Sequence, residues 1–132
     1  MRVLLDSHVV LWAVDDPSKL SANAVTTLKA PANDLLLSAG TIWEISIKVG
    51  LKKLELSTPY RQWMKRAIDD LGLTLLPITV EYTDAQAGLP RHHGDPFDRL
   101  LAAQARVENI PLVSSDPVFD QYGLKRIWNV AP

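Results

Sequence analysis

Four acidic residues spread along the chain stand where carboxylates could bind a metal ion together. Asp6 and Asp116 each come just after a short apolar run that predicts a strand, and Glu44 falls in the first turn of a helix after another such run. Asp98 lies in the first turn of a later helix. Ligands gather outside the carboxyl ends of parallel strands, so all four acids can face one cleft. Crowded carboxylates repel unless they are protonated or neutralised, and hard divalent cations prefer oxygen ligands. The pattern therefore predicts a site for Mg²⁺ or Mn²⁺.

Each acid also has a structural interpretation that needs no metal. For Asp6, the sequence supports capping of the next helix and membership of a site equally. Asp116 precedes Pro117 and is a suitable helix N-cap. Glu44 can pair with Lys48 one helical turn later, which is worth about 0.2 to 0.5 kcal/mol. The case for a site rests on the four acids together.

The segment RHHGDPFDRLLAAQAR, residues 91–106, carries a strong helix start. Asp95 before Pro96 predicts an N-cap with proline at the first helical position. At about 100° per residue, the apolar side chains share one broad face, and Arg99 lies on the opposite side. Asp98 projects from the edge of the buried face. We therefore expect Asp95 to be a structural cap and Asp98, which could also complement the helix dipole, to point into the cleft.

Short apolar strands alternate with helical segments along the sequence. Strands are expected at residues 2–5, 35–38, 73–76, 112–113 and 124–130. Helices are expected at residues 9–14, 21–29, 41–50, 59–71, 79–87 and from 96 onward. This alternation favours parallel pairing with right-handed crossovers. The predicted fold class is α/β, with three layers and a central, mostly parallel sheet of about five strands.

The composition narrows the classes of protein that the chain can belong to. With 132 residues, 47% of them hydrophobic, residues 1–132 are expected to form a single domain. The apolar runs fall well short of the ~20 residues of a membrane span, and the start of the chain does not resemble a secretory signal. Absence of cysteine excludes disulfides, thiolate nucleophiles and Cys-based zinc sites. We expect a cytoplasmic protein that makes no membrane contact.

An acid-rich metal site suits phosphodiester hydrolysis. The ion can polarise the phosphate, activate a water molecule and stabilise the departing oxygen, so no protein nucleophile is needed. Ser7 and Ser114 could orient the water or a phosphate oxygen, although serine is equally common in turns.

The net charge of −1 argues against bulk electrostatic binding of nucleic acid, so contacts with RNA must be local. Arg91, His92 and Arg99 could form a local positive rim that holds RNA. The adjacent His92 and His93 cannot easily point the same way. We therefore expect them to be loop residues or phosphate contacts rather than metal ligands.

Four segments resemble PIN-domain ribonucleases, in particular the VapC-like toxins of type II toxin–antitoxin pairs: LLDSHVVLW, SAGTIWEISIK, HHGDPFDRLLAAQA and LVSSD. The resemblance spans nearly the whole chain. The residues that match the acidic quartet of the family are Asp6, Glu44, Asp98 and Asp116. Asp95 matches the cap beside it, and Ser7 stands where many members have threonine or serine. His8 replaces the asparagine of other PIN branches.

The resemblance implies a function. It implies a parallel sheet between helices, an acidic Mg²⁺ or Mn²⁺ site, and endoribonuclease activity on RNA by water that the metal activates. It also implies homodimers and a small cognate antitoxin whose tail enters the acidic groove, presenting an arginine.

Three alternatives have less support. A receiver-type signalling domain needs paired acids after its first strand, but Asp6 is followed by Ser7 and His8. A haloacid-dehalogenase-like phosphatase needs a second acid two residues after the first, where His8 stands. A PIN-like binding module without catalysis would not need the intact quartet.

Overall fold

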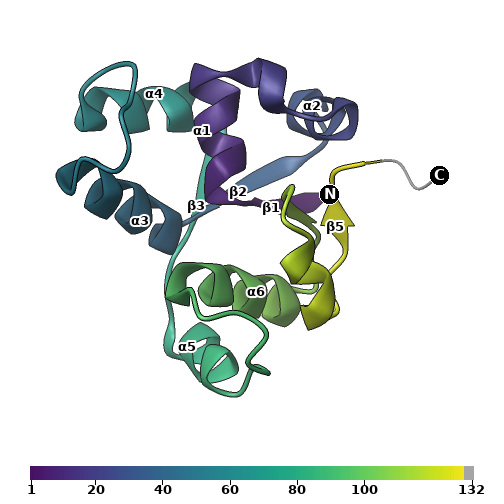
Figure 1. The fold of residues 1–132 in the computed structure, drawn as a ribbon. Helices are drawn as coiled ribbons and strands as arrows, with labels where there is room; N and C mark the ends of the chain where they lie inside the picture. The colour runs from purple at the N-terminus through teal and green to yellow at the C-terminus, as the bar shows by residue number, and fades with distance from the viewer. Residues whose placement is uncertain (130–132) are drawn as a thin grey trace.

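The computed structural model describes residues 1–129 and places them in three layers (Figure 1). The strands are β1 (Arg2–Leu5), β2 (Asp34–Ser38), β3 (Leu73–Leu76), β4 (Leu112–Val113) and β5 (Arg126–Ile127). The α-helices are α1 (Ser7–Asp15), α2 (Ala22–Lys29), α3 (Ala39–Gly50), α4 (Tyr60–Leu71), α5 (Val80–Ala87) and α6 (Pro96–Glu108). Short 3₁₀ helices cover Pro17–Lys19 and Pro117–Tyr122. The predicted α/β class is confirmed.

The strands form one parallel sheet in the order β3-β2-β1-β4-β5. The chain builds outward from β1 through β2 to β3, then returns to the other side of β1 with β4 and β5. The strand order therefore reverses between β1 and β4, which is the position where open parallel sheets bind ligands.

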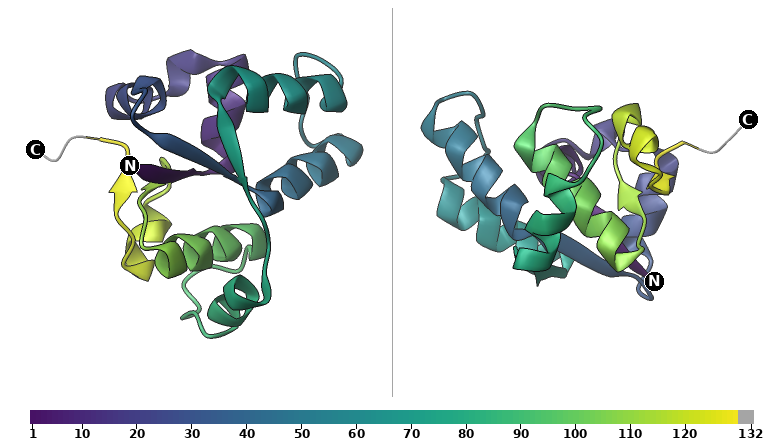
Figure 2. Two further views of the ribbon diagram at one scale, coloured as in Figure 1. Left: turned by 180° about the vertical axis from the view of Figure 1, so that it is seen from behind. Right: turned by 90° about the horizontal axis from the view of Figure 1, so that it is seen from below.

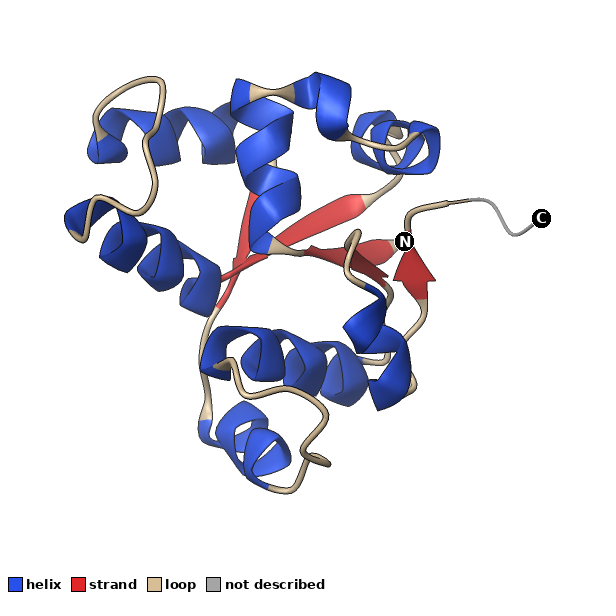
Figure 3. Ribbon diagram, in the orientation of Figure 1, coloured by secondary structure: helices blue, strands red, loops and turns tan. Residues whose placement is uncertain are grey.

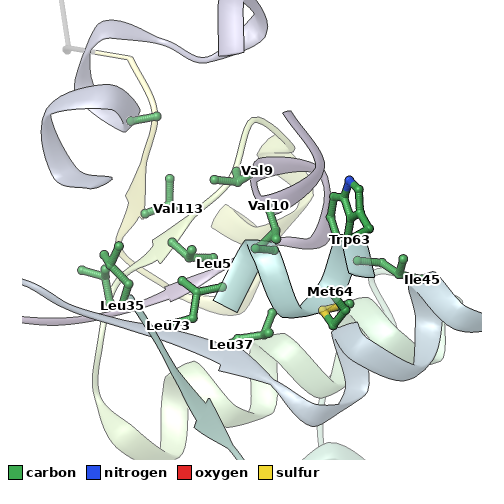
Figure 4. Packing of buried hydrophobic residues seen from close by; sticks show 13 residues of the cluster. Leu5, Val9, Val10, Leu35, Leu37, Ile45, Trp63, Met64, Leu73 and Val113 are labelled. Atoms are coloured by element: carbon green, nitrogen blue, oxygen red, sulfur yellow. The ribbon is translucent and has the colours of Figure 1, made fainter. Parts of the chain in front are cut away.

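Helices cover both faces of the sheet, as Figures 2 and 3 show from several sides. Because side chains alternate between the faces of a strand, Val3 and Leu5 belong to one buried cluster and Leu4 to the other. The first cluster includes Trp63 of α4, whose side chain is fully buried (Figure 4). The second cluster centres on α6, where Leu101 is 1% exposed. These two cores fix the sheet between its helices.

Local signals set most of the element boundaries. The side chain of Asp95 accepts hydrogen bonds from the backbone amides of Phe97 and Asp98 at the start of α6, as predicted. The last strand is shorter than predicted, with two residues in place of 124–130, because its pairing with β4 extends over two residues only. Val130, the predicted end of that strand, lies outside the described residues.

The N-terminal ends of α1, α3 and α6 meet near the same end of the sheet (Figure 1). Helix N-termini carry partial positive charge and favour nearby carboxylates. Close approach of α3 to α6 requires a glycine: a Cβ on Gly40 would lie 2.5 Å from Cδ2 of Leu100. Among residues 1–129, no helix is both long enough and apolar enough to cross a membrane.

Candidate active site

Asp6 directly follows β1 and is 3% exposed. It occupies the N-cap position of α1, but its side chain makes no capping hydrogen bond. Instead, Oδ2 accepts a hydrogen bond from the hydroxyl of Ser114 at 2.7 Å, and Oδ1 lies 3.4 Å from the donating hydroxyl of Ser7. Burial raises the pKa of Asp6, and the Ser114 hydrogen bond partly opposes that rise. The capping interpretation of this side chain is therefore wrong.

Glu44 lies on α3 and is 3% exposed. Its Oε2 accepts a hydrogen bond from Nζ of Lys48 at 2.9 Å, so the predicted ion pair is confirmed. That hydrogen bond raises the pKa of Lys48. The second oxygen, Oε1, is buried without a hydrogen-bond partner among the described residues. The ion pair therefore gives a partner to Oε2 but leaves the burial of Oε1 unexplained.

Asp98 lies in the first turn of α6, and 19% of its side chain is exposed. Burial raises the pKa of this carboxyl from 3.8 to about 8. Nearby negative charge contributes to the rise, and comes in decreasing order from Asp6, Asp95, Glu44 and Asp116. The negative charges of Asp6, Glu44 and Asp116 therefore lie close enough to Asp98 to raise its pKa.

Asp116 both caps the 3₁₀ helix Pro117–Tyr122 and belongs to the acidic cluster. Its Oδ1 accepts a hydrogen bond from the amide of Val118 at 3.0 Å, as expected for the residue before Pro117. Its own amide donates to the hydroxyl of Ser114 at 3.0 Å. Ser114 is fully buried, and the same hydroxyl donates to Asp6. A single serine therefore connects the ends of β1 and β4.

His93 belongs to the cluster, which the sequence interpretation missed. Its Nε2 lies 3.0 Å from Oδ2 of Asp98. One potential ligand atom from each of His93, Asp98 and Asp116 lies within 4.8 Å of the other two. The contact of His93 with Asp98 depends on how the loop before α6 folds, which the sequence does not reveal. The position of His93 two residues before the predicted cap Asp95 was the one available signal.

Three of the predicted RNA contacts need correction. Arg99 is 6% exposed, and its guanidinium donates hydrogen bonds to the carbonyls of Gln86, Leu89 and Pro90. It lies beneath the loop before α6 and cannot form an exposed rim. Ser7 and Ser114 are also buried, at 3% and 0% exposure, and their hydroxyls donate to Asp6 instead of facing an RNA strand.

The other two predicted contacts, Arg91 and His92, are exposed. The His92 ring packs against Tyr122 with centroids 5.2 Å apart. An RNA role for these two residues stays a prediction.

The donor set fits a hard divalent cation. It consists of carboxylates at the switch point of a parallel sheet, with one buried oxygen of Glu44 unpartnered among the described residues. A buried acceptor that lacks a partner costs about 1 to 3 kcal/mol, which a cation bound there would recover. The fold and this acidic cluster define an α/β domain with a carboxylate-lined site whose donors suit a hard cation.

Comparison of the sequence with protein families assigns the domain. The PIN domain family matches residues 3–125, and the chain belongs to that family. The receiver and dehalogenase alternatives are thereby excluded. Ribonuclease VapC22 of Mycobacterium tuberculosis is 30% identical over 115 residues, which cover 86% of each chain.

Solved structures share the fold. VapBC2 from Rickettsia felis bound to a promoter DNA fragment matches with a TM-score of 0.72 and 19% identity, covering 98% of this chain and 100% of that chain. FitAcB from Neisseria gonorrhoeae matches with a TM-score of 0.65 and 19% identity over 96% of each chain. At these identities, the likeness concerns the fold alone.

Proposed function

We propose that this chain is a divalent-metal-dependent endoribonuclease, the toxin of a toxin–antitoxin pair, in which residues 1–132 form one nuclease domain that acts in the cytoplasm. The observation that carries the proposal is the convergence of four carboxylates at the reversal of strand order, with one buried oxygen of Glu44 lacking a hydrogen-bond partner among the described residues. The relative named Ribonuclease VapC22 supports an RNA substrate.

The residues that would hold Mg²⁺ or Mn²⁺ are Asp6, Glu44, Asp98 and Asp116. When bound, the ion supplies positive charge that polarises the scissile phosphate, activates water and stabilises the departing oxygen.

The surrounding side chains prepare these ligands. Ser114 holds Asp6 through Oδ2 and leaves Oδ1 to the weaker contact with Ser7. Lys48 holds Oε2 of Glu44 and leaves Oε1 free to bind. Asp98 must lose a proton before it can ligate, because its pKa lies at about 8.

An RNA strand would lie beside the acids. A hollow of about 390 Å³ is lined in part by His8, Trp12, Lys48 and Lys53. The rings of His8 and Trp12 lie 5.6 Å apart and offer flat surfaces for bases, and the lysines offer charge for phosphates. Asp15, Asp16 and Glu55 also line the hollow and balance its lysines, so the proposed RNA contact rests on the rings and on individual lysines.

A second copy of the chain and an antitoxin are the proposed protein partners. Leu75 on the edge strand β3 is 56% exposed, and Ile78 and Val80 just beyond it are 42% and 84% exposed. An exposed apolar edge favours association with another chain, which supports a homodimer across β3. Two comparisons support an antitoxin as a partner. The chain is related to VapC22, and its fold is similar to that of a chain solved in a toxin–antitoxin complex from Klebsiella pneumoniae.

Cleavage of RNA by purified protein tests the proposal. We expect the parent to cut RNA with added Mn²⁺ or Mg²⁺, to stop with a chelator, and to recover when the metal is restored. Asp98→Asn should not cut, whereas Asp84→Asn, an exposed acid on α5, should cut like the parent. Equal cleavage by parent and Asp98→Asn, or cleavage that a chelator does not affect, would contradict a metal-dependent nuclease. Binding of RNA without cleavage would favour a binding module.

A further inference from the structure

The loop between α5 and α6, residues 88–95, is fixed onto the start of α6 by hydrogen bonds of Arg99. The guanidinium of Arg99 donates to the carbonyls of Pro90 at 3.0 Å, Gln86 at 3.0 Å and Leu89 at 3.4 Å. Arg99 is 6% exposed, so its own side chain is shielded from water. A further, exposed hydrogen bond joins the side-chain amide of Gln86 to the carbonyl of Pro96 at 3.0 Å. The clamp brings the end of the loop to the acidic cluster.

His93, near the end of this loop, is held at both ring nitrogens. Nδ1 accepts a hydrogen bond from the backbone amide of Asp95 at 2.9 Å. Nε2 lies 3.0 Å from Oδ2 of Asp98, and 26% of the His93 side chain is exposed. A neutral imidazole carries one proton, and a nitrogen that accepts a hydrogen bond does not bear it. The proton therefore resides on Nε2, the nitrogen that faces Asp98.

This tautomer decides between two roles for the ring. A histidine ligates a metal through a nitrogen that has a free lone pair, but the amide of Asp95 already occupies the lone pair of Nδ1. Nε2 carries the proton and can act only as a donor in this arrangement. The 3.0 Å separation between Nε2 and Oδ2 of Asp98 therefore favours a hydrogen bond to a ligand over direct ligation.

We propose that His93 is a positioning residue for Asp98: its Nε2–H holds Oδ2 of that carboxylate and leaves Oδ1 directed at the other acids. The inference rests on the proposed function, in which Asp98 is a metal ligand. Negative charge on Asp6, Glu44 and Asp116 repels an ionised Asp98, and a donor behind it opposes its rotation away. Hydrogen bonds of this kind to ligating groups typically change metal affinity by about 10-fold to 100-fold.

Two substitutions separate the hydrogen bond made at Nε2 from the one made at Nδ1. In His93→Gln, the side-chain amide can place an N–H where Nε2 stood, so it keeps the donor to Asp98. In His93→Asn, the shorter amide ends near the Nδ1 position, so it can accept from Asp95 but cannot reach Asp98. His92→Asn is the matched control, because His92 packs against Tyr122 instead.

The measurement is the Mn²⁺ affinity of the full-length chain by titration calorimetry, with circular dichroism to confirm folding. We expect His93→Asn to weaken Mn²⁺ binding by about 10-fold or more, and His93→Gln and His92→Asn to stay within about threefold of the parent. Equal weakening by both His93 variants would mean direct ligation or a general structural role and would overturn the proposal. Unchanged affinity in both would overturn it as well.

The tautomer of the metal-free protein gives a test that needs no metal and no activity. Imidazole ¹⁵N spectra should show the proton of His93 on Nε2, with that resonance displaced in Asp98→Asn. A proton on Nδ1 would refute the inference, as would a change to that tautomer on adding Mg²⁺. If the parent binds no divalent metal while the ring keeps this tautomer, the proposed function fails and the contact between His93 and Asp98 stands. The two failures are therefore distinguishable.

Discussion

Replacing Asp98 by asparagine is expected to stabilise the metal-free protein while abolishing its proposed activity. The carboxyl of Asp98 has its pKa raised from 3.8 to about 8 by burial and by the surrounding acids. At about 1.4 kcal/mol for each pH unit, a rise of this size corresponds to about 6 kcal/mol. Because 19% of the side chain is exposed, water and salt screen part of the repulsion, so about 6 kcal/mol is the upper limit of the gain. For a chain of this length, each kcal/mol gained raises Tm by roughly 3 to 5 °C.

The pH dependence of this gain is the sharper part of the test. Between the ordinary pKa of 3.8 and the raised value of about 8, the folded protein holds a proton that the unfolded chain has lost. Stability of the metal-free parent therefore falls as the pH rises through this window. Asparagine has no such proton, so the advantage of the variant is absent below about pH 4, grows with pH and is complete above about pH 8.

The assay is thermal unfolding of metal-free parent and Asp98→Asn across this pH range, with Asp84→Asn as the exposed control. Saturating Mn²⁺ should raise the Tm of the parent, because a ligand that binds only the folded state stabilises it, and should have little effect on Asp98→Asn. An advantage of equal size at about pH 5 and about pH 8.5, or a variant less stable than the parent at both, would refute the reasoning.

Further substitutions test the other contacts of the site and the proposed interface. Ser114→Ala leaves Oδ2 of Asp6 without its donor. We therefore expect the free energy of unfolding in urea to fall by about 1 to 3 kcal/mol and Mn²⁺ to bind about 10-fold more weakly. Unchanged affinity would show that the serine bridge does not prepare the acids. In Arg99→Lys, one ammonium cannot satisfy three carbonyls, so the free energy of unfolding should fall by about 1 to 3 kcal/mol. The control Arg91→Lys should be as stable as the parent. Equal stability of the two variants would contradict the role given to the Arg99 hydrogen bonds. Ile78→Glu should convert a dimer to a monomer in sedimentation velocity. The control is Leu51→Glu, because Leu51 is also apolar and exposed but lies at the far end of α3, and this variant should stay dimeric. A monomeric parent would refute the homodimer.

Much of the fold was accessible from the sequence because its signals are local. Asp95 before Pro96 identifies the start of α6, and Asp116 before Pro117 identifies the next helical turn. Asp6 and Asp116 come just after strands, and in a parallel sheet that sequence pattern predicts a shared edge without knowledge of the packing. The placement of these two acids at one end of the sheet was therefore predictable.

Other features of the site depend on contacts between distant segments. A helical projection correctly places Arg99 away from the main apolar face of α6, but it cannot show that the preceding loop covers the guanidinium. Ser114 has the sequence context of a turn, and only the pairing of β1 with β4 brings it to Asp6. His93 gains its place from the same loop that buries Arg99. Tertiary contacts of this kind leave no periodic pattern in the sequence.

The serine bridge also bears on when the protein becomes complete during synthesis. Asp6 is synthesised before its hydrogen-bond partner Ser114, which lies 108 residues later. Strand β1 lacks its β4 neighbour until that later segment emerges, so a ribosome-bound chain that ends before β4 holds Asp6 without its partner strand and without Asp116. Such a nascent chain is unable to assemble the cluster, and any cleavage of RNA that depends on the cluster must await synthesis of residues 112–116. Truncation anywhere before β4 yields the same incomplete state.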